Sequence, residues 1–388
     1  MKEVRNALRD QMTVSHSLAY FDHAAVAPIP VRTHEAMVEY VHELAESGDM
    51  HWLKWAKQLS ELRERIAQLI TADPSEIALV SNTTSGLSIV AESFPWQPGD
   101  NVVTPENEFP SNLLPWRNLE RRGVEHRTFS VPSNGELRIE DLEAVMDSKT
   151  RLVSLSWVGF ASGYRIDVSQ FANFIHGRGC LLVLDAIQGL GAFPLNVKSC
   201  DVDFLAADGH KWMLGPEGAG LLYVKKKHLE RLQPIGVGWN SLAAGSFDPN
   251  SCHLKNTMAR FEGGSYNMAG LIGLGASLST LLGVFEANSV AAIGDCILEN
   301  VAEIAERLRG VGFEVSLPVE SKHRSGIVGV SHSRWQGNLD ANSMSARKHC
   351  LQHGIVCSVR SGKLRVSTHA YNNCDDIERL VSALTMIV

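Results

Sequence analysis

Residues Cys180 to Lys211, CLLVLDAIQGLGAFPLNVKSCDVDFLAADGHK, contain two apolar runs that each lead into polar residues. The first run ends at Asp185, and the second, over 202–206, is soon followed by Lys211. In a chain where strands and helices alternate, both runs are expected to be strands, and parallel strands end at the same edge of a sheet. The sequence therefore predicts a carboxylate and an amine that face one small space.

Similar apolar runs recur along the first two thirds of the chain, separated by amphipathic stretches. Seven of them are expected to be strands, at 77–80, 101–104, 124–129, 152–157, 180–184, 202–206 and 220–224. These runs consist of Val, Leu and Ile with almost no polar alternation, which is typical of strands buried on both faces. The pattern predicts an α/β fold with a mainly parallel seven-stranded sheet between layers of helices.

The pattern changes near residue 277, where a long helical stretch at 290–308 precedes shorter strands and helices. We expect a large α/β domain at 19–276 and a smaller α+β domain at 277–388. The amphipathic residues 1–18 are expected to pack on the smaller domain.

Composition excludes several classes of partner. The chain has 388 residues, a net charge of −7 and a pI of about 6.1, which gives no basic surface for nucleic acid. Its seven cysteines are scattered without a CxxC motif, so we expect no metal site and a reduced, cytoplasmic protein. No apolar run reaches the roughly 18 residues of a membrane span, and no signal peptide is visible, so no membrane partner is expected.

Other polar and aromatic residues are expected at the same edge of the sheet as Asp185. Thr83 and Thr84 lie between a strand and a helix, where hydroxyls and free N–H groups can hold phosphate, although taken alone such residues are more often plain helix caps. Phe109 could stack on an aromatic ligand or pack in the core. Gln188, three residues after Asp185, faces the same space or lies on the surface.

These residues suggest pyridoxal phosphate as the ligand. That cofactor needs a lysine to form a Schiff base and an acid to keep the ring nitrogen protonated, and Lys211 and Asp185 could supply them. Burial and a nearby pyridinium would lower the pKa of Lys211 and make the amine nucleophilic. Arg360 and Arg365 flank the residues SGK and could clamp a substrate carboxylate, with a surface ion pair as the alternative.

The segments LDAIQ at 184–188 and DGHKWMLGPEGAG at 208–220 resemble the class V aminotransferases. This fold type I pyridoxal-phosphate group includes cysteine desulfurases, kynureninases and isopenicillin-N-epimerase-like proteins. The likeness runs from YFDHAAVAPIP at Tyr20 to LRVSTHAYN at Leu364. It implies that Lys211 is the Schiff-base lysine, Asp185 the partner of the ring nitrogen and Gln188 the partner of the ring hydroxyl.

The resemblance also implies roles for residues that spacing alone would not single out. Asp208 stands where many relatives place a phosphate-binding serine, so we expect it at the cofactor, turned toward N–H groups or a histidine. FEGGSYN at 261–267 is similar to the segment that reaches the neighbouring subunit's phosphate, which implies a homodimer with shared active sites. The remaining assignments are phosphate contacts for Thr83, Thr84, His210 and Ser265, ring stacking for Phe109, and substrate contacts for His23, Ala24, Asn112, Arg360 and Arg365.

Two departures from the family pattern bear on the substrate. Desulfurases carry a catalytic cysteine on a loop between the two C-terminal arginine positions, whereas here that loop is only Ser361-Gly362-Lys363. Phe160 stands where many relatives have asparagine. The resemblance implies an aminotransferase-like enzyme that acts at Cα of an amino acid through an external aldimine. Cysteine desulfurase, C–S or C–C lyase, epimerase and a non-catalytic cofactor-binding protein stay open as alternatives.

Overall fold

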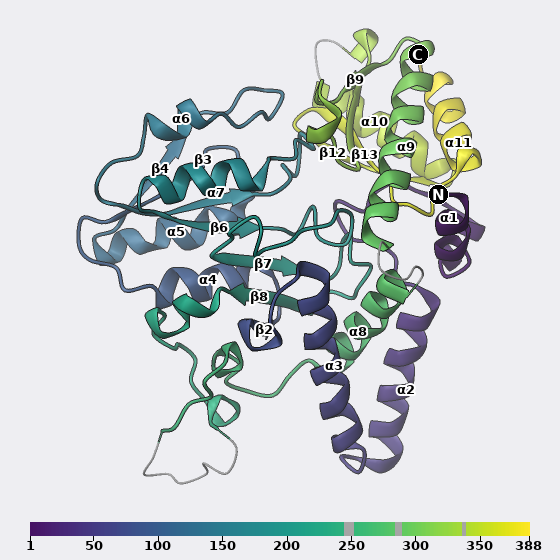
Figure 1. Ribbon diagram of the computed structural model, residues 1–388. Coiled ribbons are helices and arrows are strands. Elements are labelled where there is room, and N and C mark those ends of the chain that lie inside the picture. The colour runs from purple at the N-terminus through teal and green to yellow at the C-terminus, as the bar shows by residue number, and fades with distance from the viewer. Residues whose placement is uncertain (244–251, 284–288, 336–338) are drawn as a thin grey trace.

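A seven-stranded sheet forms the centre of the larger body of the molecule (Figure 1). The structure is a computed structural model that describes residues 1–243, 252–283, 289–335 and 339–388. The strand order is β2 (Ile77–Val80), β8 (Gly220–Val224), β7 (Phe204–Asp208), β6 (Leu181–Asp185), β5 (Thr150–Ser156), β3 (Asn101–Pro105) and β4 (Glu125–Phe129). Only β8 runs antiparallel to its neighbours. The predicted mainly parallel seven-stranded sheet is thus confirmed.

Successive residues of each central strand face two different apolar cores. On β6, Leu182 and Leu184 face one core and Val183 faces the other. The first core is covered by α3 (Trp52–Ile70), α7 (Val168–Gly177) and α8 (Met268–Gly283), and the second by α4 (Thr83–Ser93) and α5 (Leu114–Arg117). Burial on both faces explains why these strands read as continuous apolar runs in the sequence.

A second, antiparallel sheet organises the C-terminal part. Its order is β12 (Ser358–Arg360), β13 (Lys363–Ser367), β10 (Ile327–Ser331) and β9 (Glu314–Ser316). Three helices pack on it around a third core, namely α9 (Ser289–Gly310), α10 (Leu339–Gln352) and α11 (Cys374–Thr385). The division predicted at residue 276 falls within α8, whose buried side chains belong to the first core, and it stays a prediction.

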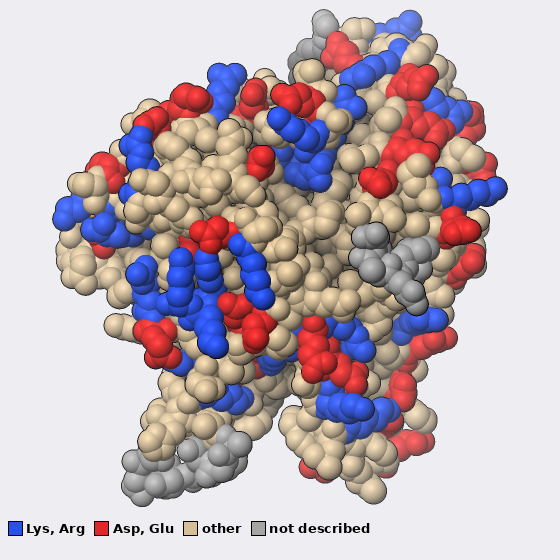
Figure 2. Space-filling model, in the orientation of Figure 1, with Lys and Arg blue, Asp and Glu red and all other residues tan. Residues whose placement is uncertain are grey.

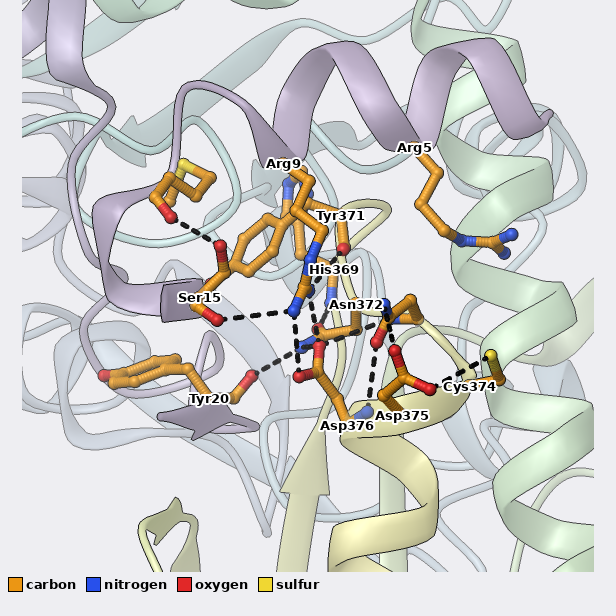
Figure 3. Close-up of polar contacts among 12 residues, drawn as sticks. Arg5, Arg9, Ser15, Tyr20, His369, Tyr371, Asn372, Cys374, Asp375 and Asp376 are labelled. Atoms are coloured by element: carbon orange, nitrogen blue, oxygen red, sulfur yellow. Dashed lines mark hydrogen bonds and ion pairs between the residues drawn. The ribbon is translucent and has the colours of Figure 1, made fainter. Parts of the chain in front are cut away.

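The N-terminal segment lies against the C-terminal helices (Figure 3). Helix α1 (Lys2–Arg9) packs on α9, and β1 (Ala19–Tyr20) pairs with β11 (Ile355–Val356). Arg9 reaches from α1 to the N-terminal turn of α11, where its Nη1 lies 2.8 Å from Asp376 Oδ2 and donates to the Tyr371 carbonyl. Two ends of the chain are therefore joined by a partly buried ion pair.

Two elements complete the described fold. Helix α2 (Val31–Ser47) extends from the body beside α3, and the short helix α6 (Ile139–Glu143) lies near the edge strand β4 (Figure 1). Acidic and basic side chains are interspersed over the face in Figure 2, in keeping with the small net charge. None of the helices in the described ranges has an apolar stretch that could span a bilayer.

Candidate active site

A cavity of about 350 Å³ lies beyond the C-terminal ends of β6 and β7. Most of the residues singled out in the sequence line it, namely Ala24, Thr83, Thr84, Phe109, Asp185, Gln188, Asp208, His210, Lys211, Arg360 and Arg365. The sheet edge thus brings together residues that are up to 341 positions apart in the chain. This placement follows the general rule that open α/β sheets bind ligands at the carboxyl ends of their strands.

Asp185 is the last residue of β6, and its carboxylate is only partly satisfied. One oxygen, Oδ1, accepts a hydrogen bond of 3.1 Å from the Ile187 N–H. Burial raises the pKa of Asp185 to about 6, although the Ile187 N–H and the charge of Lys211 act in the opposite direction. A buried carboxylate in this state is well suited to a cationic N–H donor, which would stabilise its charge.

Lys211 lies in the turn after β7 and lines the same cavity as Asp185. Its Nζ is 5.7 Å from the centroid of the Phe109 ring, and it makes no hydrogen bond or ion pair within the described part of the chain. Burial lowers the pKa of Lys211 to about 8, against the charge of Asp185, and the charge of Arg365 lowers it further. A larger share of the amine is therefore neutral and nucleophilic near neutral pH than for an ordinary lysine.

Close packing fixes the turn that carries Lys211. A Cβ at Gly209 would lie 2.7 Å from Leu274 Cδ1 of α8 and 2.9 Å from the Ala219 carbonyl oxygen. No side chain fits there without displacing backbone, so glycine at this position lets the turn sit on α8. This packing holds Lys211 beside the cavity.

The N-terminus of α4 lies at one end of the cavity. Asn82 caps this helix, with its Oδ1 accepting from the Ser85 N–H at 2.8 Å. Thr83 is therefore free of the capping role, and its buried Oγ1 has no hydrogen-bond partner among the described residues. A free buried hydroxyl beside the first N–H groups of an 11-residue helix suits a phosphate.

Asp208 and His210 lie at the same end of the cavity. The Oδ2 of Asp208 is 3.1 Å from the Nδ1 of His210, a close approach without hydrogen-bond geometry, since this Nδ1 has no hydrogen-bond partner among the described residues. The other oxygen, Oδ1, has no hydrogen-bond partner among the described residues. Thr84 donates from Oγ1 to Ser111 at 2.8 Å. Polar atoms at this end thus remain free to contact a ligand.

Arg365 provides a buried cation at the opposite end. It lies on β13, is 2 % exposed, and donates to the Phe160 carbonyl at 2.9 Å and to Ser358 Oγ at 3.1 Å. Its Nη2 is 3.3 Å from Asp22 Oδ1. Burial lowers the pKa of Arg365 to about 10, partly offset by Asp22, so the group stays charged at neutral pH. It can therefore bind a substrate carboxylate.

The observed groups fit pyridoxal phosphate. Thr83 and the N-terminus of α4 would hold the phosphate, and Asp185 would hold the ring nitrogen. Phe109, which is 40 % exposed and packs edge-on against Phe160, offers a face to the ring. Lys211 would supply the amine.

Three residues expected at the site do not line this cavity. His23 is buried behind Ala24, with Nδ1 2.9 Å from the Ser367 carbonyl and Nε2 2.8 Å from the Tyr371 hydroxyl. Burial lowers the pKa of His23 well below its usual value, and nearby His369 adds to the shift, so the ring is neutral. Both ring nitrogens are bonded within the protein, and His23 does not line the cavity. A substrate contact by His23 therefore stays a prediction.

Asn112 and Ser265 also lie elsewhere. The Oδ1 of Asn112 accepts from Trp116 Nε1 at 3.0 Å and from Ser154 Oγ, inside the protein. Ser265 lines a separate cavity of about 270 Å³ beside Ser81 and Ser85. The predicted contact of Ser265 is with the phosphate of a neighbouring subunit. A single chain does not test that contact, so this role stays a prediction.

Gln188 lines the cavity, but its amide is tied to the protein. Its Nε2 donates to the Ala24 carbonyl at 3.0 Å, and its Oε1 accepts from Trp212 Nε1 at 2.9 Å. Trp212 follows Lys211 directly and is fully buried. Gln188 therefore joins the N-terminal segment, the end of β6 and the lysine turn.

Glu108 is a residue of this region that the sequence analysis missed. It is buried next to the cavity, where Oε1 accepts from the Ser156 N–H at 2.7 Å and Oε2 from the Ser156 hydroxyl. Burial raises the pKa of Glu108 to about 7, and the charge of Asp185 adds to this, whereas the bonds from Ser156 lower it. Its place just after β3, one residue before Phe109, was the signal that could have identified it.

Comparison with known proteins extends the likeness over the whole chain. The family model "Aminotransferase class-V" matches residues 19–380. A "Probable cysteine desulfurase" of Methanothermobacter thermautotrophicus is 30% identical, over 95% of this chain and 94% of that protein. A "Cysteine desulfurase" of Escherichia coli strain K12 is 29% identical, over 95% and 93%.

Solved structures share the fold. An apo cysteine desulfurase from Thermococcus onnurineus NA1 superposes with a TM-score of 0.86 at 25% identity, covering 99% of this chain and 98% of that one. The cystine C–S lyase C-DES, in complex with cysteine persulfide, gives a TM-score of 0.86 at 22% identity, covering 95% and 97%. At that identity the second likeness concerns the fold alone.

Proposed function

The chain belongs to the aminotransferase class-V family of pyridoxal-phosphate enzymes, and from this premise we propose that it transfers the amino group of an amino acid substrate. When bound, the cofactor supplies an electron sink next to the substrate Cα. The observation that carries the proposal is that a buried Lys211, whose Nζ has no hydrogen bond or ion pair among the described residues, lines the same cavity as the buried Asp185.

Lys211 is the proposed acid and base of the reaction. Because its pKa is lowered to about 8, the amine can take a proton from Cα and return it near neutral pH. Asp185 would keep its charge through the cationic partner that it lacks in the protein itself.

Arg365 is proposed to orient the substrate. Its guanidinium lines the cavity and can bind the α-carboxylate, which would place Cα toward Lys211. The aromatic pair Phe109 and Phe160 covers the same space and would exclude water from it.

A second candidate is C–S bond cleavage, as in a cysteine desulfurase or a C–S lyase. The similarity to two cysteine desulfurases over nearly the whole chain favours it. The turn between β12 and β13, Ser361-Gly362, has no thiol that could accept sulfur, and Cys357 is fully buried. A desulfurase that works through a protein persulfide is therefore disfavoured, whereas simple elimination is not.

Product analysis distinguishes the candidates. Purified holoenzyme is incubated with a panel of L-amino acids, each with and without a keto acid acceptor, and the products are identified by mass spectrometry. Amino transfer predicts the keto acid of the donor together with the amino acid of the acceptor. Pyruvate and ammonia without acceptor dependence would indicate elimination, and alanine with sulfide from cysteine would indicate desulfuration.

We further propose a homodimer with shared active sites. Support comes from exposed apolar side chains at helical spacing on α2, namely Val38, Val41 and Leu44, continued by Met50 and Leu53 around the next turn. Ser265, near the first turn of α4, would reach the partner's cofactor. The cytoplasmic location stays a proposal, supported by seven free cysteines.

A further inference from the structure

A second and larger cavity, of about 810 Å³, adjoins the cavity that holds Lys211. It lies between loops of the large sheet and the strands β9, β10 and β13 of the smaller one. The two cavities share Ser156, Phe160 and Arg360 as lining residues. The place where the two cavities meet, here called the neck, has Phe160 as its aromatic residue.

A tight hairpin places two cations at the rim of the large cavity. Only two residues, Ser361 and Gly362, connect β12 to β13. Both have positive φ, 49° and 74°, as a tight two-residue hairpin turn requires. The hairpin therefore holds Arg360 and Lys363 opposite each other, where they form a pair in its register. With so short a connection the cavity stays open beside them.

These two cations have no acidic partner among the described residues. Arg360 is exposed, and in the part of the chain that the structure describes its side chain donates only to the neighbouring Val359 carbonyl, while Lys363 Nζ donates to Ser316 Oγ at 2.7 Å. Arg365, in contrast, already has Asp22 at 3.3 Å. The charge of Arg360 lowers the pKa values of Arg365 and Lys211, so its guanidinium acts on the groups of the small cavity.

The positions of the three cations differ in a useful way. Arg365 lines only the small cavity, Arg360 lines both, and Lys363 lines only the large one. The α-carboxylate needs one of them, and Arg365 is the buried one at the small cavity. A second anion, farther along the substrate, would account for the other two.

Resting on the proposed function, we propose that the substrate is an amino acid with an anionic group at the end of its side chain, bound by Arg360 and Lys363 in the large cavity. The side chain crosses the neck beside Phe160. Glu108 is the carboxylate in the lining of this cavity, and both of its oxygens accept from Ser156, so it does not pair with either cation. Its raised pKa, about 7, further weakens its repulsion of an anion.

A matched pair of substrates tests this. L-2-aminoadipate and L-norleucine have the same chain length and differ in a terminal carboxylate against a methyl group. Each is titrated into holoenzyme, with half-saturation read from the cofactor absorbance and kcat/KM from product formation. We expect aminoadipate to be favoured by about tenfold or more in both measurements.

Variants assign the preference to the two cations. Lys363→Gln should reduce the preference by about tenfold, with norleucine changed less than about threefold. Arg360→Gln should also reduce the preference by about tenfold, whatever its effect on norleucine. The exposed Lys348 on α10 is a matched control, and Lys348→Gln should leave the preference unchanged. Arg360 also lines the small cavity, where it could contact the α-carboxylate. Lys363→Gln is therefore the variant that tests the side-chain anion alone.

The outcomes separate this inference from the function on which it rests. Equal affinity for the two amino acids, or a preference that survives both variants, overturns the anionic tail and leaves amino transfer intact. If no amino acid in the panel changes the cofactor absorbance, the proposed function fails and this inference fails with it.

Discussion

Two buried aspartates on neighbouring strands have opposite surroundings. Asp203, just before β7, is bonded by His176 Nε2 and His228 Nε2, both at 2.7 Å, and by the Leu182 N–H at 3.0 Å. Burial alone would raise the pKa of Asp203, but these bonds hold it below its usual value. Within the described ranges, the carboxylate of Asp185, at the end of β6, accepts a hydrogen bond only from the Ile187 N–H, and burial raises its pKa to about 6.

The difference separates a structural residue from a ligand-binding one. Asp203 lies at the edge where β6 and β7 begin, and its partners come from the protein. Asp185 lies at the edge where those strands end, and its missing partner is a cation that the cavity can admit. A buried carboxylate with incomplete hydrogen bonding lowers the stability of the fold. Such a group is typical of positions that serve binding or chemistry.

Among the variants compared, replacement of Lys211, which lines the same cavity as Asp185, should give the largest loss of turnover. Lys211→Ala is expected to lower turnover by about 10⁴-fold because the acid and base of the reaction is lost. The thermal midpoint of the cofactor-free protein should not fall, since a buried amine without a partner is removed. Lys348→Ala is the control. Turnover within tenfold of wild type would remove Lys211 from the chemistry.

Asp185→Asn should lower kcat by about 10³-fold, because a neutral amide no longer stabilises a charged ring nitrogen. The cofactor-free variant is expected to be at least as stable as wild type, since a strained buried charge has gone. Kinetics and thermal unfolding of the two proteins check both statements. A clear loss of stability would mean that Asp185 is as fully bonded as Asp203.

Asp203→Asn should have the reverse profile. Removing the charge from a buried group with two histidine partners is expected to lower the free energy of unfolding by about 3 kcal/mol. Turnover should be unchanged below the unfolding transition, because Asp203 lies at the opposite edge of the sheet. The measurement is denaturant unfolding with activity assayed on the same samples. A stable but inactive variant would contradict the contrast.

The smallest effects are expected in the pH dependence of stability, which should differ in sign for Asp203 and Asp185. Asp203 has a lowered pKa, so its stabilisation is present above the ordinary aspartate value near 3.8 and is lost as pH falls below it. Asp185 has a raised pKa, so its charge costs stability above about pH 6, and this cost disappears toward pH 4.

Thermal scans of cofactor-free protein between pH 7 and 4 check these signs. The advantage of Asp185→Asn over wild type should shrink by about 2–4 °C across this range. The deficit of Asp203→Asn should stay constant until the pH falls below 4. Parallel curves for all three proteins would refute the assigned pKa directions.

The sequence predicted the sheet and the opposed Asp185 and Lys211 because both depend on local patterns, namely apolar runs and the polar residues that follow them. It did not predict that Asn82, rather than a threonine, caps α4. It also did not show that His23 is bonded to Tyr371, 348 residues away, since such contacts depend on tertiary packing. Glu108 was missed because its burial depends on Ser156 of another strand.

The most direct test of the account is to find where pyridoxal phosphate is attached. Wild-type protein loaded with the cofactor is reduced with borohydride, digested, and mapped by mass spectrometry, with Asp203→Asn as a folded comparison. We predict one modified peptide in both proteins, carrying the label on Lys211. Label on another lysine, or none after loading, would contradict the assignment of the cavity at the ends of β6 and β7.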